Sequence, residues 1–204
     1  MAVNYMTSIG DPKQLKSLLK DDVLAGKTEK RIVFAGRSNA GKSSLLNSLT
    51  RSKIAQISRE PGKTRKVNLF FCSFLNRVLS DLPGYGFAKR NKTERKLWEE
   101  LITSYLTADK DNIERIILVT DCRHGPADSD LDAMDFFQEL GFQVTLVLSK
   151  SDKLNQKARS KRNKEIKELL IDSKPEKQFW ISSLKGTGVR ELSRDIINDP
   201  TRTD

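Results

Sequence analysis

Residues 36–43 read GRSNAGKS and directly follow a short apolar run at residues 32–35. The two glycines of this segment allow a tight turn whose backbone N–H groups point inward, toward the oxygens of a phosphate group. Lys42 carries a positive charge that reaches outer phosphates, and Ser43 offers a hydroxyl, an oxygen ligand of the kind that Mg²⁺ prefers. The spacing predicts a loop that binds a triphosphate.

The alternative for this loop is a glycine turn that only caps a helix. A buried strand before it and an amphipathic run at Leu45, Leu46 and Leu49 after it favour the phosphate interpretation. The predicted contacts of the loop are Gly36, Arg37, Ser38, Asn39, Ala40, Gly41, Lys42, Ser43 and Ser44.

A second candidate site follows the strand-like run at residues 74–79 and reads Asp81-Leu82-Pro83-Gly84. Ligands of open α/β sheets bind at the carboxyl ends of strands, where we place Asp81. Its carboxylate can hold the hydration shell of Mg²⁺, and the Gly84 N–H can contact a γ-phosphate and sense its loss. A plain turn is the alternative, but the position downstream of the phosphate loop favours the nucleotide role.

The third and fourth candidate sites select the base. Asp152, in Ser149-Lys150-Ser151-Asp152, can accept hydrogen bonds from N1–H and the 2-amino group of guanine, which adenine lacks. The stem of Lys150 can lie over the base. Backbone N–H groups of Ile181, Ser182 and Ser183 can meet the guanine O6. A solvated loop and a simple strand-to-helix connection are the respective alternatives.

The elements that must position these sites alternate along the chain. Apolar runs at residues 32–35, 116–119 and 144–148 do not alternate with polar residues, which is typical of parallel strands buried on both faces. Helical apolar patterns lie between them, so we predict a three-layer α/β fold of the P-loop NTPase type. Its apolar helix positions are Leu97, Leu101, Tyr105, Leu131, Met134, Phe137, Leu140, Ile166, Leu169, Leu170, Val189, Leu192 and Ile196.

One pair of strands breaks this rhythm. The runs at residues 67–71 and 74–79 are separated by two residues, too few for a crossover helix, and predict an antiparallel hairpin. The predicted sheet is therefore mixed, mostly parallel and six-stranded. We expect residues 1–29 to form an N-terminal extension with a short helix at 11–24. Residues 30–198 form the nucleotide-binding domain, and residues 199–204 a frayed tail.

Bulk composition narrows the class of partner. The 204 residues carry a net charge of +10, which favours a polyanionic partner. Aromatic residues make up only 7%, so contact with an RNA backbone is favoured over base stacking or DNA sequence readout. The chain shows no apolar run long enough to span a membrane and no secretory signal, and we expect a cytoplasmic monomer with Cys72 and Cys122 as buried thiols.

The basic residues gather most densely in residues 153–177. This stretch is either a solvated helix face or a surface that faces ribosomal RNA. Its Lys and Arg outnumber its acids, and they are Lys153, Lys157, Arg159, Lys161, Arg162, Lys164, Lys167, Lys174 and Lys177. The single histidine, His124, fits a polar loop residue better than one that touches the nucleotide-sensing loops.

The four sites in this order resemble those of Ras-like GTPases of the translation-factor class. The combination of GRSNAGKSS, PGKTR, DLPGYGFA and SSLKGTG is similar to the bacterial EngB family, also called YihA or YsxC. The resemblance covers residues 30–198. It implies GTP and GDP as ligands, and a role in large ribosomal subunit assembly, normal cell division and septation.

The resemblance also implies a mobile loop at residues 54–66, whose Thr64 completes the coordination of Mg²⁺ in the GTP state. The implied nucleotide contacts of this loop are Gly62, Lys63 and Thr64. The implied metal ligands are Ser43, Thr64 and, through water, Asp81. The implied catalytic residues are Lys42, Thr64, Gly84 and Asn39.

Two positions affect the expected activity. Ser149 stands where many relatives open the guanine box with Thr or Asn, and we expect the base choice to be unchanged. Tyr85 stands where Ras-type enzymes place a water-orienting glutamine, so we expect slow intrinsic hydrolysis. A potassium ion held through Asn39, or an arginine or RNA element of the ribosome, would then supply the missing transition-state charge.

The expected mechanism is a switch in which GTP and Mg²⁺ order the loops of Thr64 and Gly84 and hydrolysis releases them. One rival is a nucleotide-gated RNA- or ribosome-binding module in which hydrolysis is incidental. A second rival is a metabolic P-loop kinase, which would need an acceptor domain and would not need a guanine contact at Asp152.

Overall fold

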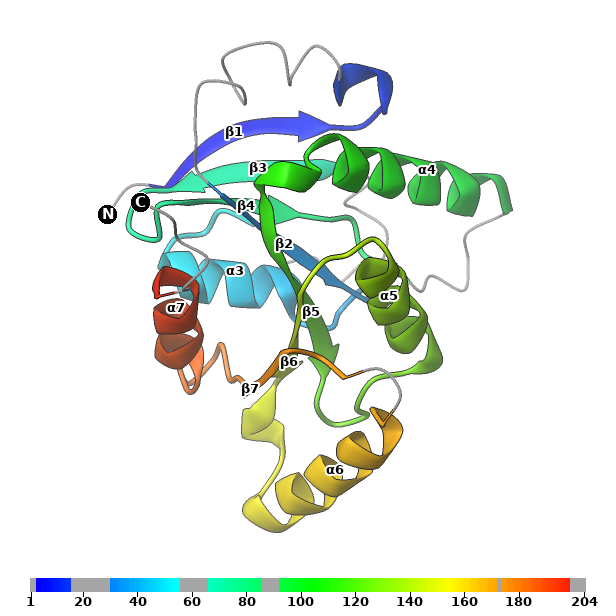
Figure 1. Ribbon diagram of the computed structural model, residues 1–204. Helices are drawn as coiled ribbons and strands as arrows, with labels where there is room; N and C mark the ends of the chain where they lie inside the picture. The colour runs from blue at the N-terminus through cyan, green and yellow to red at the C-terminus, as the bar shows by residue number, and fades with distance from the viewer. Residues whose placement is uncertain (1–2, 16–29, 56–65, 86–91, 172–173, 199–204) are drawn as a thin grey trace.

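The structure, a computed structural model, describes residues 3–15, 30–55, 66–85, 92–171 and 174–198. Strands and helices alternate along most of the chain (Figure 1). The strands are β1 (Val3–Ile9), β2 (Arg31–Gly36), β3 (Val67–Cys72), β4 (Arg77–Asp81), β5 (Ile113–Asp121), β6 (Val144–Ser149) and β7 (Lys177–Trp180). The α-helices are α3 (Lys42–Thr50), α4 (Lys92–Ala108), α5 (Asp128–Glu139), α6 (Gln156–Leu169) and α7 (Val189–Ile197), with short 3₁₀ turns at Lys110–Asn112 and Ser151–Lys153.

The strands form one seven-stranded sheet in the order β1-β3-β4-β2-β5-β6-β7. Strand β3 pairs antiparallel with both β1 and β4, while β4, β2, β5, β6 and β7 pair in parallel. The mixed, mostly parallel α/β sheet is confirmed, but the count of six strands was wrong by one. Strand β1 was missed because its residues are largely half-buried or exposed, and the pattern VNYMTSI lacks an apolar run.

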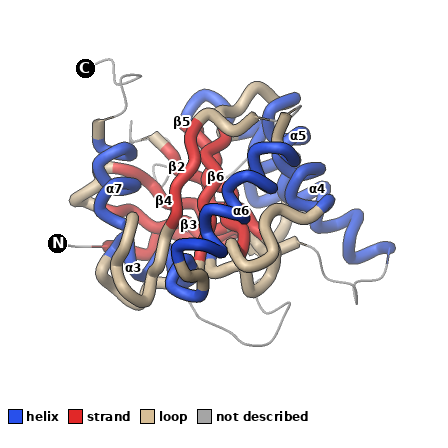
Figure 2. The backbone as a smooth tube through the Cα atoms, turned by 90° about the horizontal axis from the view of Figure 1, so that it is seen from below, coloured by secondary structure: helices blue, strands red, loops and turns tan. Residues whose placement is uncertain are grey.

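The side chains of β2 show how the sheet separates two apolar layers. Ile32 and Phe34 join one buried cluster, and Val33 and Ala35 join the other. Helices α3 and α7 cover the first face, whereas α4, α5 and α6 cover the second, as Figures 1 and 2 show from two directions. Buried on both faces, the central strands have no room for polar alternation, which explains their continuous apolar sequences.

The hairpin of β3 and β4 differs from its prediction in the turn. Residues 73–76 form the turn, and Asn76 adopts a left-handed backbone with φ of 50°. Strand β4 therefore begins at Arg77 instead of Phe74 and extends to Asp81 instead of Leu79, which places Asp81 at its carboxyl end, as predicted. Asparagine is one of the few side chains that tolerates this backbone, so the turn chemistry agrees with the sequence.

Two predicted apolar helix positions face outward. Leu97 is 60% exposed on α4, where Trp98 packs against the core instead, and Leu169 is 46% exposed at the end of α6. The predicted helix at residues 11–24 lies mostly outside the described residues, with residues 13–15 helical. The predicted tail at residues 199–204 also lies outside them.

The parallel register brings the ends of the central strands to one edge of the sheet. Phe34 pairs with Asp81, Gly36 pairs with Val119, and Asp121 pairs with Ser149. The loops that follow β2, β4, β5 and β6 therefore emerge side by side, where ligands of such sheets bind. Within the described residues, no helix is long and apolar enough to cross a membrane.

Candidate functional site

The loop between β2 and α3 turns sharply because it has glycine at two constrained positions. A Cβ on Gly36 would lie 2.5 Å from the Val119 carbonyl oxygen of the neighbouring strand. Gly41 has φ of 102° and immediately precedes the first residue of α3, Lys42. The structure thus places the predicted loop at the positive end of a helix dipole, in the strand–loop–helix context that binds phosphate groups.

A buried ion pair joins this loop to β4. The ammonium group of Lys42 donates to the carboxylate of Asp81, and the two residues are only 8% and 3% exposed. The pairing arises because Asp81 ends a strand that runs parallel to β2, from which the loop leaves. The Lys42 ammonium group has the charge to bind a polyphosphate, and the Asp81 carboxylate has the charge to bind a hydrated cation. These are the ligands that the sequence predicts for the two groups. Ser43, the predicted direct Mg²⁺ ligand, lies beside Lys42 and is half-buried.

The loop after β4 lies directly against the phosphate loop. The Ser38 N–H donates to the Tyr85 carbonyl over 3.2 Å, and Arg37 and Tyr85 form an isolated parallel bridge. A Cβ on Gly84 would lie 2.9 Å from Ser38 Oγ, so glycine lets the two loops approach. Gly84 therefore lies close enough to the phosphate loop to contact a phosphate that is bound there.

Tyr85 serves as an internal anchor in this structure. Its hydroxyl donates to Asp130 Oδ1 on α5 over 2.7 Å, and its ring makes an edge contact with Trp98 of α4. The Trp98 indole N–H in turn donates to the Pro83 carbonyl over 3.0 Å. Burial raises the pKa of the Asp130 carboxyl, although bonds from the Ala127 N–H and the Tyr85 hydroxyl oppose that rise. The charged form of the buried Asp130 carboxyl is thus stabilised by the hydrogen bonds that it accepts from Ala127 and Tyr85.

The predicted base-binding residues also meet the phosphate loop. The Ser149 hydroxyl donates to the Ala40 carbonyl oxygen. Lys150 has a left-handed backbone with φ of 57°, and its Nζ donates to the Asn39 carbonyl oxygen over 2.6 Å. Ser149, which stands in place of the usual Thr or Asn, therefore makes a side-chain bond to the phosphate loop.

Asp152 and Ser182 come together from the segments that follow the neighbouring parallel strands β6 and β7. The Ser182 hydroxyl donates to Asp152 Oδ1 over 2.7 Å, and this bond lowers the pKa of the Asp152 carboxyl. The Ser151 N–H donates to the Ile181 carbonyl over 3.0 Å, which joins the third and fourth predicted motifs. Ser183 follows in the same loop. The carboxylate is thus held ionised, the form that accepts hydrogen bonds.

Sequence reasoning missed Asp121, which ends β5 at the same sheet edge. Its carboxylate accepts from Lys150 Nζ over 2.9 Å and from the Arg123 guanidinium over 2.6 Å. Burial disfavours the charge of Asp121, but hydrogen bonds from Arg123 and Lys150 outweigh burial and hold its pKa well below the usual range. The signal available in the sequence was its position at the end of a buried strand. His124, in the following loop, is exposed.

Part of the predicted site lies outside the described residues. Gly62, Lys63 and Thr64 lie in residues 56–65, which the structure does not describe. The last three residues of the DLPGYGFA segment lie in residues 86–91, which are also outside the described residues. Among the residues that the structure does describe, no group of three or more His, Cys, Asp or Glu side chains could hold a metal ion.

Replacing Tyr85 tests its role as an anchor. Tyr85→Phe removes one donor from the buried Asp130 carboxylate, so we expect a loss of about 1–3 kcal/mol in the free energy of unfolding at neutral pH. The loss should shrink as the pH falls toward the raised pKa of Asp130, because a protonated carboxyl needs the donor less. Urea unfolding at two pH values measures both effects. Tyr5→Phe, at a 61% exposed tyrosine, is the control, and equal stability of Tyr85→Phe and the parent at both pH values would contradict the anchor.

Comparison with known proteins agrees with this geometry. The sequence profile described as "50S ribosome-binding GTPase" matches residues 31–150. The chain is 43% identical over 167 residues to the probable GTP-binding protein EngB of Clostridium beijerinckii, across 81% of this chain and 83% of that protein.

Solved structures show the same fold. A crystal structure of a probable GTP-binding protein EngB matches with a TM-score of 0.64 and 26% identity, covering 83% of this chain and 99% of that one. Era in complex with MgGDPNP and nucleotides 1506–1542 of 16S ribosomal RNA matches in fold, with a TM-score of 0.66 and 24% identity over 82% of this chain and 55% of Era. The chain therefore belongs to the EngB family of GTP-binding proteins and contains a GTPase domain.

Proposed function

We propose that this GTPase is a slow, Mg²⁺-dependent switch that acts in the assembly of the large ribosomal subunit. The observation that carries the proposal is the buried contact of Lys42 with Asp81, because it brings the expected phosphate-binding cation beside the carboxylate expected to hold hydrated Mg²⁺. Its roles in normal cell division and septation, its cytoplasmic location and its monomeric state belong to the same proposal and rest on the resemblance to the family.

The phosphate half of the proposed site uses the residues of the first two motifs. Lys42 binds the outer phosphates, and the amide groups around Gly41 bind phosphate oxygens at the start of α3. Ser43 ligates Mg²⁺, Asp81 holds its water, and Thr64 adds a ligand in the GTP state. When bound, Mg²⁺ neutralises the charge that develops on the phosphates. The residues 36–44 and 81–84 would line this half.

In the half of the site that binds guanine, the Asp152 carboxylate accepts hydrogen bonds from the edge of the base. The aliphatic part of the Lys150 side chain lies over the face of the base. The bond from Ser182 supports this assignment, because it turns the Asp152 carboxylate toward the loop of Ile181–Ser183, from which O6 would be contacted. Ser149 and Ser151 hold these loops together. A metabolic kinase would not need this arrangement.

Hydrolysis is proposed to be slow because Tyr85, in place of the water-orienting glutamine, is engaged with Asp130. Asn39 is proposed to hold K⁺ through its side chain, since its carbonyl is already bonded to Lys150. A ribosomal arginine or RNA element is the other source of transition-state charge.

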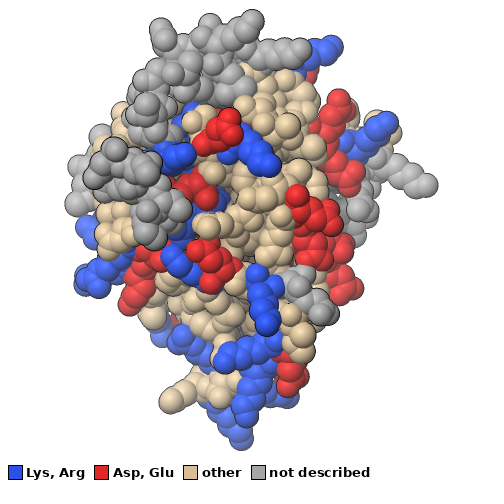
Figure 3. All heavy atoms as spheres, in the orientation of Figure 1, with Lys and Arg blue, Asp and Glu red and all other residues tan. Residues whose placement is uncertain are grey.

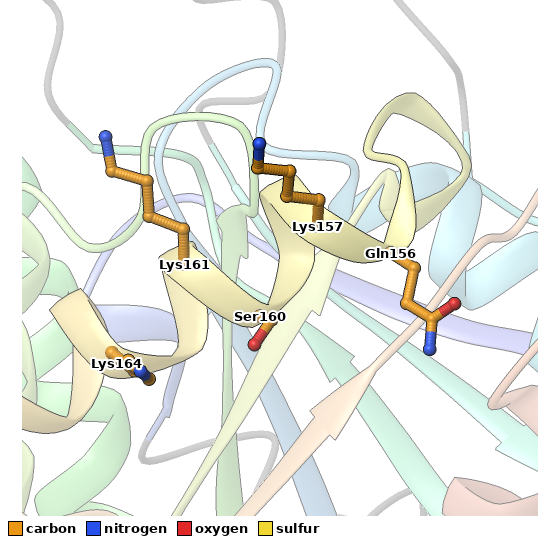
Figure 4. A pocket seen from close by; sticks show the side chains of 5 residues that line it. All are labelled: Gln156, Lys157, Ser160, Lys161 and Lys164. Atoms are coloured by element: carbon orange, nitrogen blue, oxygen red, sulfur yellow. The ribbon is translucent and has the colours of Figure 1, made fainter.

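The proposed partner is the large subunit or its RNA, contacted in part through α6. Lys and Arg side chains gather over this helix at the lower end of the molecule in Figure 3. Lys157, Lys161 and Lys164 line an open hollow of about 640 Å³ together with Gln156 and Ser160 (Figure 4). Such spacing on one helix face suits a phosphate backbone. The bound 16S RNA fragment of Era shows that a protein of this fold binds ribosomal RNA.

Base choice is tested at Asp152. Asp152→Asn should lower the affinity for GTP by about 100-fold or more and favour xanthosine nucleotides, because an amide offers the wrong donors and acceptors to guanine. Titration calorimetry with GTP, ATP and xanthosine triphosphate measures this. The exposed Asp132→Asn is the matched control. Equal binding of ATP and GTP by the parent protein would instead support the kinase rival.

Potassium dependence is tested at Asn39. GTP turnover should be higher in K⁺ than in Na⁺ buffer, and Asn39→Gly should lose this difference. Glycine is the appropriate replacement because Asn39 has φ of 63°, where alanine would be strained. Turnover that is equal in both salts, or stimulation that survives the substitution, would refute the proposal.

Ribosome contact through α6 is tested by charge reversal. Lys157→Glu, Lys161→Glu and Lys164→Glu together should weaken co-sedimentation with large subunits and reduce the salt slope by about one per lysine that contacts a phosphate. The matched control reverses the exposed Lys13, Lys53 and Arg190, with the same change in net charge. An equal loss of co-sedimentation in both variants would indicate that binding depends only on the net charge of the protein.

The same assay separates the switch from its rival. Binding should differ between GDP and a non-hydrolysable GTP analogue, and large subunits should accelerate single-turnover hydrolysis. Nucleotide-dependent binding without acceleration would favour a nucleotide-gated binding module in which hydrolysis is incidental.

A further inference from the structure

Asp121 lies between two cations at the carboxyl end of β5. Its side chain is 14% exposed and forms ion pairs with Lys150 and with Arg123, whose side chains are 31% and 44% exposed. The Arg123 fork contacts both carboxylate oxygens, with Nε at 3.0 Å from Oδ1 and Nη2 at 2.6 Å from Oδ2. Neither Asp121 nor Arg123 belongs to the four motifs of the proposed site.

The contact with Asp121 restrains the position of Lys150. The lysine Nζ lies 2.9 Å from Asp121 Oδ2 and 2.6 Å from the Asn39 carbonyl oxygen in the phosphate loop. A lysine side chain is otherwise among the most mobile in proteins, and a ligand that needs it in one conformation must order it. Two acceptors at the tip of the chain remove much of that freedom before a nucleotide arrives.

The loop after Asp121 is in turn fixed to α6. The His124 and Gly125 N–H groups donate to the Asp121 carbonyl over 3.1 and 3.0 Å. Arg162 on α6 donates to the Arg123 carbonyl over 2.8 Å and to the His124 carbonyl over 3.2 Å. These bonds form a continuous path from α6 through the loop to Lys150.

We propose that Asp121 is a positioning residue for guanine nucleotides, acting through Lys150, and that Arg162 extends this control to α6. The inference rests on the proposed placement of the Lys150 stem over the base. It adds a residue outside the sequence motifs and joins the basic helix to the nucleotide site. A partner that displaces Arg162 thereby changes nucleotide affinity without touching the nucleotide.

A double-mutant cycle tests the link between Asp121 and Lys150. The affinity for a fluorescent GDP analogue with Mg²⁺ is measured for the parent, Asp121→Asn, Lys150→Ala and the double variant. Asp121→Asn should weaken binding about five- to tenfold, since a charged partner of Lys150 is lost. In the Lys150→Ala background the same change should alter affinity less than about twofold, because residues that act through one another are not additive.

The controls separate this inference from the proposed guanine site. Asp111→Asn, an exposed aspartate at the opposite end of β5, should leave affinity unchanged. Two results would overturn the inference and leave the proposed guanine site intact. One is an equal loss of affinity from Asp121→Asn in the parent and in Lys150→Ala. The other is unchanged affinity in Asp121→Asn while Lys150→Ala binds more weakly. Unchanged affinity in Lys150→Ala would overturn the guanine role of Lys150 itself, and the inference with it.

The extension to α6 has its own pair of variants. Arg162→Ala frees two loop carbonyls and should weaken GDP-analogue binding about two- to threefold, the effect of one modest hydrogen bond. Lys167→Ala removes an exposed cation from the same helix and should have no effect. Equal affinities for the two variants would overturn the role of Arg162.

Discussion

The ion pair of Lys42 and Asp81 is the interaction on which the site depends. Both charges are almost fully removed from water, which is unfavourable unless each has a partner of opposite sign. The parallel pairing of β2 with β4 makes the partnership possible, since it brings the end of β4 beside the start of α3. In the structure these two charges form a neutral pair. A polyphosphate with its metal ion brings the matching opposite charges, so each group can exchange one partner for another and remain compensated.

The phosphate-facing and base-facing loops behave as one connected body. Ser149 and Lys150 bond to carbonyls of the phosphate loop, and Ser151 bonds to the Ile181 carbonyl. All three bonds end on a backbone carbonyl, but two of the donors are side chains, the Ser149 hydroxyl and the Lys150 ammonium group. Ser149 can therefore stand where relatives have Thr or Asn and still hold the loop, because the bond needs only a short side chain with a hydrogen-bond donor, which a hydroxyl or an amide supplies.

The sequence predicted the parts of this molecule that follow local rules. The glycines Gly36 and Gly41, the continuous apolar strands and the place of Asp81 at the carboxyl end of β4 could be predicted, because each follows from a steric or burial constraint within a few residues. The partners of Tyr85 and Asp121 were not readable, because Asp130 and Lys150 approach them only through packing of distant elements. Strand β1 was missed for a related reason: its pairing with β3 stabilises it, while its own residues carry no apolar pattern. Leu97 shows the opposite error, an apolar residue that fits the helical period but lies on the solvent side.

Strand β1 also has a consequence for self-association. In the described part of the chain it ends the sheet beside β3, and β7 ends the other side. The β1 ladder is interrupted by an irregularity between Tyr5 and Thr7, and β7 has only four residues and begins with a lysine. Irregular, short and charged terminal strands are poor templates for another strand. The sheet is thereby discouraged from growing edge to edge between molecules.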